Sequence, residues 1–369
     1  MIRTLLLGLT LATPLAAQDS LATQTAAAAA RLSAAEQLMA EAPHSGEAVA
    51  TLVAAVQTYE DGLIAVSAGL RDTAAQQDAL ERALREDRAQ VAQLLAVLQT
   101  QPLNVQPTLA IHPGGMRRAA QAQMIRSAAA PALQQDAADL RAKLGQLQKV
   151  AALQETATAT YAAGEAGLLA AHMALQQALD DQPDLPARFD EDAEVIAALQ
   201  DAAPTRDEFV AALTRIHAGG LPNDAALASK GALPLMVTGR ALPRDAEATG
   251  LIIATPPQAL LVAPTSATVL YQGPLPGFDL AVVLEPTPGT TFVFGGLSRT
   301  FAQAGQLLPA GWPIGLVGGA AEPSDAELSK NIAVSAGNDA QALYLEVRDG
   351  QGLTDPATWF ALEKQVDVK

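Results

Sequence analysis

The stretch Ala342–Phe360, ALYLEVRDGQGLTDPATWF, decides the fold of the C-terminal part of the chain. Its first seven residues alternate as in a β-strand with one buried face, and Asp349-Gly350 and Asp355-Pro356 mark the turns that follow. Similar short runs rich in Val, Leu, Ile and Thr, separated by Gly and Pro, extend back to Leu233. This pattern predicts an all-β domain over residues 231–369.

Composition excludes several classes of function. The net charge of −16 argues against nucleic acid and against anionic membrane surfaces as partners, because both need clustered Lys and Arg. The chain has no cysteine, so disulfides, thiolate metal sites and cysteine nucleophiles are excluded. Half of the 369 residues are apolar and only 4% are aromatic, which favours long alanine-rich helices beside a smaller globular domain.

The N-terminus has the pattern of a secretory signal peptide over residues 1–17. Arg3 precedes an apolar run from Leu5 to Ala12, and Pro14 and the small residues Ala16 and Ala17 follow. The run is too short to span a membrane comfortably as an uncleaved anchor. We therefore expect cleavage after Ala17 and a periplasmic protein.

Residues 18–182 are predicted to form a long antiparallel coiled-coil hairpin. Good helix formers fill residues 26–99, interrupted at Ala42–Gly46, and a heptad series from Val56 is mostly apolar. A connection rich in Pro and Gly separates this run from a second one over residues 116–181, which favours two helices that fold back on each other. The polar seam positions Thr73, Gln77 and Asp87 are expected to set register or loosen the seam rather than to bind a ligand.

Residues 183–230 form an acidic linker with one short predicted helix over 205–217. Thr205 can cap its start, and Gly219-Gly220 ends it. Its apolar face consists of Phe209, Val210, Leu213 and Ile216. This face either packs on its own neighbours or belongs to a mobile element that covers a groove elsewhere, and the residues alone leave both open.

Four blocks of the β domain, in order, carry a resemblance to a known family. They are LPLMVTGRAL, TGLIIATPPQALLVAPTSATVLYQGPLPGF, AGQLLPAGWPIGLVGG and ALYLEVRDGQGLTDPATWF. Together they resemble the LytM-type domain of the EnvC and NlpD family, which is related to zinc endopeptidases that cut peptidoglycan. The order of signal, coiled coil, short helix and β domain is similar to that of EnvC-like murein hydrolase activators. The resemblance implies an α + β multidomain protein with a C-terminal LytM-type (lysostaphin-like) domain.

The resemblance also implies that this domain is degenerate. The zinc ligands and catalytic histidines of active relatives correspond here to Ala248, Ile252, Gly296, Ala342 and Tyr344. Zinc needs three protein donors from His, Asp, Glu or Cys and an open position for water. Alanine, isoleucine and glycine side chains cannot supply them, so we expect neither a metal nor another cofactor.

The composition of the β domain supports the same expectation without the resemblance. The last histidine of the chain is His217, and none of the other three has a partner at metal-ligand spacing. Carboxylates remain, among them Asp245, Glu247, Glu285 and Glu346, but an all-carboxylate catalytic zinc site would be very unusual. Since Gly-x-Ser-x-Gly, phosphate-loop and Ser/His/Asp patterns are missing too, catalysis is not expected.

A hydrolase fold without ligands keeps its groove. The resemblance implies that Ala248, Ile252, Gly296, Ala342 and Tyr344 line it, that Tyr271 and Arg348 form its polar edge, and that the helix over 205–217 blocks it at rest. Its implied partner is a periplasmic N-acetylmuramoyl-L-alanine amidase, activated during cell division, and the coiled coil would be held by the FtsEX membrane complex. For Tyr344 and Arg348, ordinary strand packing and a surface charge are equally open.

Three other classes were compared with this one. A periplasmic adaptor of an export pump would place β sequence before residue 26, where none is found. An active metallopeptidase needs the ligands that are missing. A non-catalytic peptidoglycan-binding or scaffold protein of the periplasm stays open as the alternative.

Overall fold

The computed structural model describes residues 14–45, 47–100, 115–182, 185–217, 223–242, 250–318, 341–350 and 352–362. The chain divides into two compact units. The smaller consists of Met1–Ala30 with Ala65–Ala163, and the larger of Arg31–Ile64 with Gly164–Lys369. Ala248 lies outside the described residues, as does His112.

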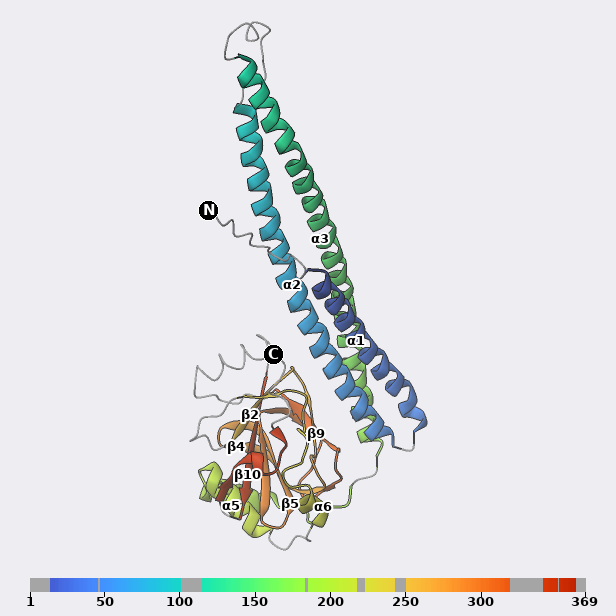
Figure 1. Cartoon of the computed structure of the whole chain (residues 1–369). Coiled ribbons are helices and arrows are strands. Elements are labelled where there is room, and N and C mark those ends of the chain that lie inside the picture. The colour runs from blue at the N-terminus through green and yellow to red at the C-terminus, as the bar shows by residue number, and fades with distance from the viewer. Residues whose placement is uncertain are drawn as a thin grey trace. The chain divides into compact units, whose positions relative to one another are not determined.

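Three long helices make up the N-terminal half (Figure 1): α1 (Pro14–Glu41), α2 (Ala48–Thr100) and α3 (Gly115–Asp180). The run predicted over 26–99 is thus two helices, because the Pro-containing 3-10 turn η1 (Ala42–His44) separates them. The first of them already starts at Pro14, before the predicted cleavage position.

Small residues let the helices of the larger unit approach closely. A Cβ added at Gly164 of α3 would lie 2.8 Å from Leu63 of α2 and 3.0 Å from Leu32 of α1, and one at Gly167 would lie 2.6 Å from the ring of Tyr59. Later residues of α2 thus contact earlier residues of α3, so the two run antiparallel here. The coiled-coil hairpin itself stays a prediction.

Within the smaller unit, the polar seam residue Asp87 forms an ion pair with Lys143 of α3 at 2.5 Å. Among the described residues, Ala48–Gln93 of α2 is long and apolar enough to cross a membrane by length and composition, but half of its most apolar window is buried. The core helix of a soluble protein can have the same length and apolar composition.

The described residues of the β domain form two antiparallel sheets (Figure 1). The larger has the order β1 (Arg240–Ala241), β2 (Leu251–Thr255), β10 (Gln341–Asp349), β6 (Thr290–Gly295), β5 (Phe278–Thr287), β4 (Ala267–Leu275) and β8 (Leu307–Leu308), with β11 (Gly352–Thr354) paired to β10. The smaller has the order β3 (Leu260–Val262), β9 (Pro313–Val317) and β7 (Leu297–Thr300).

The stretch Ala342–Phe360 lies at the centre of this architecture. Most of β10 pairs with β2 on one side and β6 on the other, and its odd residues Leu343, Leu345 and Val347 are fully buried. Trp359 follows the 3-10 turn η3 (Pro356–Thr358) and packs edge-on against Phe292 of β6. Because successive side chains of a strand point to opposite faces of the sheet, the even-numbered residues of β10 lie on the other face.

Three short helices precede the sheets: α4 (Ala193–Ala202), α5 (Arg206–Ile216) and α6 (Asp224–Ala228). The helix expected over 205–217 is α5, and Thr205 and Glu208 form a reciprocal capping box at its start. Sequence analysis missed α4, although Asp192 caps it by accepting hydrogen bonds from the backbone N–H groups of Glu194 and Val195.

One carboxyl group of the larger unit is buried without a counter-charge. The Glu60 side chain of α2 accepts a hydrogen bond from the backbone N–H of Leu260 in β3 at 2.7 Å, and the residue is 2% exposed. Its Oε2 has no partner within the described part of the chain. Burial disfavours the charged form and raises the pKa of Glu60 to about 8, so the neutral acid predominates at neutral pH.

We expect Glu60 to make the protein less stable at alkaline pH. Its pKa is higher in the folded state than the ordinary 4.5, so its contribution is fully present below pH 4.5 and is lost as the pH rises through 8. Each unit of pKa shift corresponds to about 1.4 kcal/mol, which gives a loss of several kcal/mol. Glu60→Gln should match the wild type in urea unfolding at pH 4.5 and be more stable at pH 9.

The matched control is Glu86→Gln, an exposed acid of the same helix, which should leave the pH profile unchanged. Parallel pH profiles for the wild type and Glu60→Gln would contradict the prediction.

Candidate functional site

A row of paired residues crosses four strands on one face of the larger sheet. Tyr271 of β4 pairs with Val283 of β5, Val283 with Val293 of β6, and Val293 with Glu346 of β10. Directly paired residues share a face of a sheet, so these four side chains form a continuous strip, the covered row. All four are buried.

Helices α4 and α5 cover this row. Phe209, Val210 and Leu213 of α5 are at most 1% exposed and belong to one apolar cluster with Tyr271, Val283 and Val293. Ile216, expected as the fourth member of the packed face, is 50% exposed. Ile216 is the last residue of α5, three positions after Leu213, so the packed face is one residue shorter than the sequence analysis predicts.

Tyr271 lies beneath the helices rather than at an open edge. Its ring meets that of Phe209 edge-on, with centroids 4.9 Å apart. Its hydroxyl donates to the carbonyl of Pro274 at 2.7 Å and receives a hydrogen bond from Gln200 of α4 at 3.1 Å. Burial raises the pKa of Tyr271, so the hydroxyl stays protonated and is satisfied within the fold.

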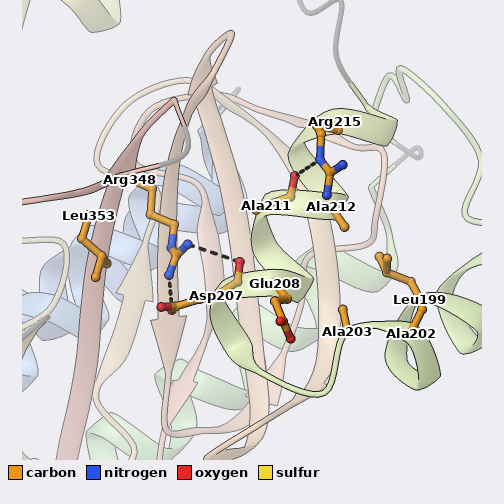
Figure 2. Close-up of a pocket in the computed structure, with 10 residues that line it drawn as sticks. All are labelled: Leu199, Ala202, Ala203, Asp207, Glu208, Ala211, Ala212, Arg215, Arg348 and Leu353. Atoms are coloured by element: carbon orange, nitrogen blue, oxygen red, sulfur yellow. Dashed lines mark hydrogen bonds and ion pairs between the residues drawn. The ribbon is translucent and has the colours of Figure 1, made fainter.

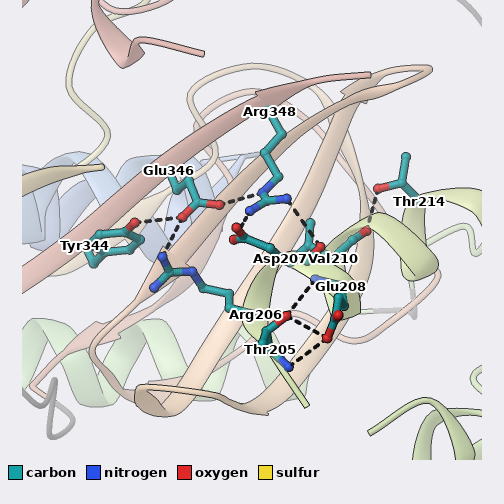
Figure 3. A network of polar contacts seen from close by, with 9 residues as sticks. All are labelled: Thr205, Arg206, Asp207, Glu208, Val210, Thr214, Tyr344, Glu346 and Arg348. Carbon is teal, nitrogen blue, oxygen red and sulfur yellow. Dashed lines mark hydrogen bonds and ion pairs between the residues drawn. The ribbon is translucent and has the colours of Figure 1, made fainter. Parts of the chain in front are cut away.

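At the β10 end of the row, Glu346 is fully buried among three donors (Figure 3). Tyr344 donates its hydroxyl to Oε2 at 2.7 Å, and Arg348 donates Nε to Oε1 at 2.6 Å. Both come from the same strand, two residues away on either side. The third donor is Nη2 of Arg206, at 3.1 Å from Oε2. Arg206 is the first residue of α5, so the helix completes the environment of the carboxylate.

The first turn of α5 thus contacts the sheet through two ion pairs (Figure 3). The helix supplies the base in one pair and the acid in the other. Arg206 reaches Glu346, while the next residue, Asp207, accepts from the guanidinium of Arg348. The Arg206 guanidinium also lies 4.9 Å from the centroid of the Tyr344 ring, a cation–π distance. The alternation of base and acid fixes both the position and the direction of the helix on the strand.

The structure brings most of the predicted groove positions together beside this network. Tyr344 pairs with Ile252 of β2 on one side and with Gly295 of β6 on the other. A Cβ added at Gly250 would lie 2.4 Å from the Tyr344 ring, so the ring lies directly against that glycine. Ala342 and Ile252 are partly buried together. Gly296 follows β6 with a φ of 89°.

These residues do not fit a zinc ion. Ile252 and Ala342 have no donor atoms, and the hydroxyl of Tyr344 already donates to Glu346. Within the described ranges, no group of three or more His, Cys, Asp or Glu is placed to hold a metal. We therefore derive no metal-dependent step for this site.

An open pocket of about 560 Å³ lies next to α5, with Leu199 of α4, Asp207 of α5, and Arg348 and Leu353 of the sheet among its lining residues (Figure 2). Arg348 in it is already paired with Asp207. The pocket therefore offers no free charge from this arginine to an incoming ligand.

Sequence reasoning missed the charged residues that join α5 to the sheet. The pattern around Arg206 and Asp207 predicts only the start of a helix, and Glu346 counts only as one of the remaining carboxylates. The alternation of β10 contains a signal for part of this, because it puts residues 344, 346 and 348 on one face. The sequence of α5 contains no pattern that indicates which strand its charged residues contact.

No family model matches the chain, and no curated protein matches it. Solved structures similar to it include a putative M23 peptidase from Pseudomonas aeruginosa, at 20% identity over 47% of this chain and 64% of that one, with a TM-score of 0.34. Another is a zinc-containing peptidase from Vibrio cholerae, at 17% identity over 36% of this chain and 37% of that one, with a TM-score of 0.26. The catalytic domain of lysostaphin from Staphylococcus simulans is similar at 17% identity over 32% of this chain and 84% of that one, with a TM-score of 0.24.

The structural neighbours are thus domains of the LytM/M23 peptidase type. The chain spans less than two thirds of the first two. The described part of the chain combines long helices with an antiparallel β domain.

We expect Glu346 to be essential for the stability of the β domain. Glu346→Gln keeps the shape but removes the charge that faces Arg206 and Arg348. Breaking a buried ion pair by removing one partner costs about 3 kcal/mol or more. The control is Asp349→Asn on the same strand, whose side chain is 54% exposed and 3.8 Å from Lys230. This change should cost less than about 1 kcal/mol. Equal shifts of the two urea midpoints would contradict the prediction.

Proposed function

We propose that this chain is a non-catalytic activator of periplasmic N-acetylmuramoyl-L-alanine amidases, which promotes peptidoglycan splitting during cell division. The sequence blocks that resemble the EnvC-like activators suggest this role. The observation that carries the proposal is α5: a short helix covers the strand on which active relatives would hold their third zinc ligand and catalytic histidine, and it is anchored there by Arg206 and Asp207.

The covered row is suited to bind a helix in place of α5. It offers the apolar side chains Tyr271, Val283 and Val293 beside the charged pair Glu346 and Arg348. An isolated helix of 11 residues is marginal in water, so α5 owes its structure to these contacts. A partner helix with a similar apolar face can therefore compete for the same surface.

In this proposal the amidase supplies that partner helix, and α5 keeps the surface closed until a signal arrives. The long helices would receive the signal from an FtsEX-type membrane complex. The periplasmic location follows from the signal peptide expected over residues 1–17.

The test compares two charge reversals on the same helix. Arg206→Glu places a carboxylate against Glu346 and should release α5. Arg215→Glu changes the same charge at an exposed position whose Nε donates only to the carbonyl of Ala211. The helix dipole favours an acid at the first position and disfavours one in the last turn, so dipole effects predict the opposite order of the two variants.

We expect the mature Arg206→Glu chain to stimulate a periplasmic amidase of the same organism at a concentration about tenfold lower than wild type or Arg215→Glu. Dye release from labelled peptidoglycan is the readout. Equal stimulation by all three chains would contradict the role of α5. If no chain changes the rate, yet all sediment with peptidoglycan, the non-catalytic scaffold is the better account.

A further inference from the structure

The opposite end of α5 is held by a segment that precedes the helix in sequence. Residues 185–189, called the strap here, run antiparallel to the edge strand β8, with Ala187 bridged to Gln306. The backbone N–H of Leu307 donates to the carbonyl of Pro186 at 2.8 Å, and that of Arg188 donates to the carbonyl of Gly305 at 2.7 Å. The strap is therefore fixed to the sheet by backbone hydrogen bonds.

Gly305 makes this close approach possible. Its φ is 83°, and a Cβ there would lie 1.9 Å from the carbonyl oxygen of Phe189. Both the backbone conformation and the lack of space exclude other residues. The fit shows that the strap and the turn before β8 are built for each other.

Arg188 connects the strap with two other elements. Its Nη1 donates to Oε2 of Glu285 in β5 at 2.7 Å, and its Nη2 donates to the carbonyl of His217 at 2.5 Å. The Glu285 side chain is 2% exposed and that of Arg188 is 23% exposed, so the carboxylate of this ion pair is shielded from water. His217 is the C-terminal cap residue of α5, and a cation near this end of a helix is stabilised by the helix dipole.

A second contact involves the neighbouring side chain. The rings of Phe189 and His217 are stacked, with centroids 3.8 Å apart and planes inclined by 17°. The strap thus contacts His217 in two ways. Arg188 donates a hydrogen bond to its carbonyl, and the ring of Phe189 stacks on its imidazole. Only an arginine can bind Glu285 and the carbonyl at once through two nitrogens of one planar group.

We propose that Arg188 is a latch that holds the C-terminal end of α5 against the sheet. The helix then has two separate anchors, because its first turn is fixed by Glu346 and Arg348 of β10 and its last turn by Arg188 of the strap. The strap begins five residues after Asp180, the last residue of α3. Along the chain, Arg188 is therefore the first anchor of α5 that follows the long helices. The contact of Arg188 with α5 is independent of the proposed function. The idea that this contact regulates amidase binding rests on the proposed function.

The experiment measures hydrogen exchange of the full chain, without any amidase. Arg188→Ala should raise the exchange rate of the α5 amides, Phe209 to Ile216, by about tenfold or more, because two charge-assisted hydrogen bonds are lost. Arg188→Lys keeps the positive charge but loses the planar group with two donor nitrogens. It should raise the exchange rate of the α5 amides less than Arg188→Ala does. Arg299→Ala is the matched control, since Arg299 is exposed on β7 and remote from α5 in its contacts.

The amides of β5 and β6 serve as an internal reference. Unchanged α5 exchange in Arg188→Ala would overturn the latch, and so would a rise that β5 and β6 share equally, because Arg188 would then stabilise the whole domain. If Arg188→Ala does not fold, Arg188→Lys decides by the same comparison. Amidase stimulation by the same variant is measured separately, by dye release. Faster α5 exchange without increased stimulation would uphold the latch and contradict the role of α5 in the proposed function.

Discussion

The rest of the β domain depends on how one buried carboxylate is satisfied. Glu346 is fully buried in the middle of the sheet, where an unpaired charge is strongly unfavourable. Two of its donors, Tyr344 and Arg348, come from its own strand, and the third, Arg206, comes from α5. Strand, network and helix therefore form one cooperative arrangement, and the helix cannot move without changing the environment of the carboxylate.

In the proposed function, the same arrangement lets α5 be both well ordered and replaceable. Three apolar side chains hold its middle, and charged groups hold its two ends. When the helix leaves, Glu346 keeps its two donors from β10 and gains access to water, so the cost of opening is limited. A surface that loses one helix and offers matched charges and apolar rings is suited to accept another.

The described positions that the sequence resemblance matches to zinc ligands contact neighbouring residues of the fold. Ile252 and Ala342 both pack against the cluster of Leu242 and Ala254. Tyr344 occupies the space against Gly250 and donates to Glu346. The polar group that remains on this face is a carboxylate neutralised by two guanidinium groups. Charged and apolar side chains therefore share this face of the larger sheet.

The sequence by itself determined the local features: the long alanine-rich helices, the capping box that starts α5, and the alternation that makes Ala342–Arg348 a strand. These follow from neighbours in the chain, so propensity and periodicity suffice. Only the tertiary structure decided that Arg206 reaches Glu346, 140 positions later in the numbering, that Arg188 reaches both Glu285 and His217, and that Ile216 is left exposed. Such pairs are set by which strands adjoin and where a helix lies across them, because contact between distant residues has no period in the sequence that could reveal it.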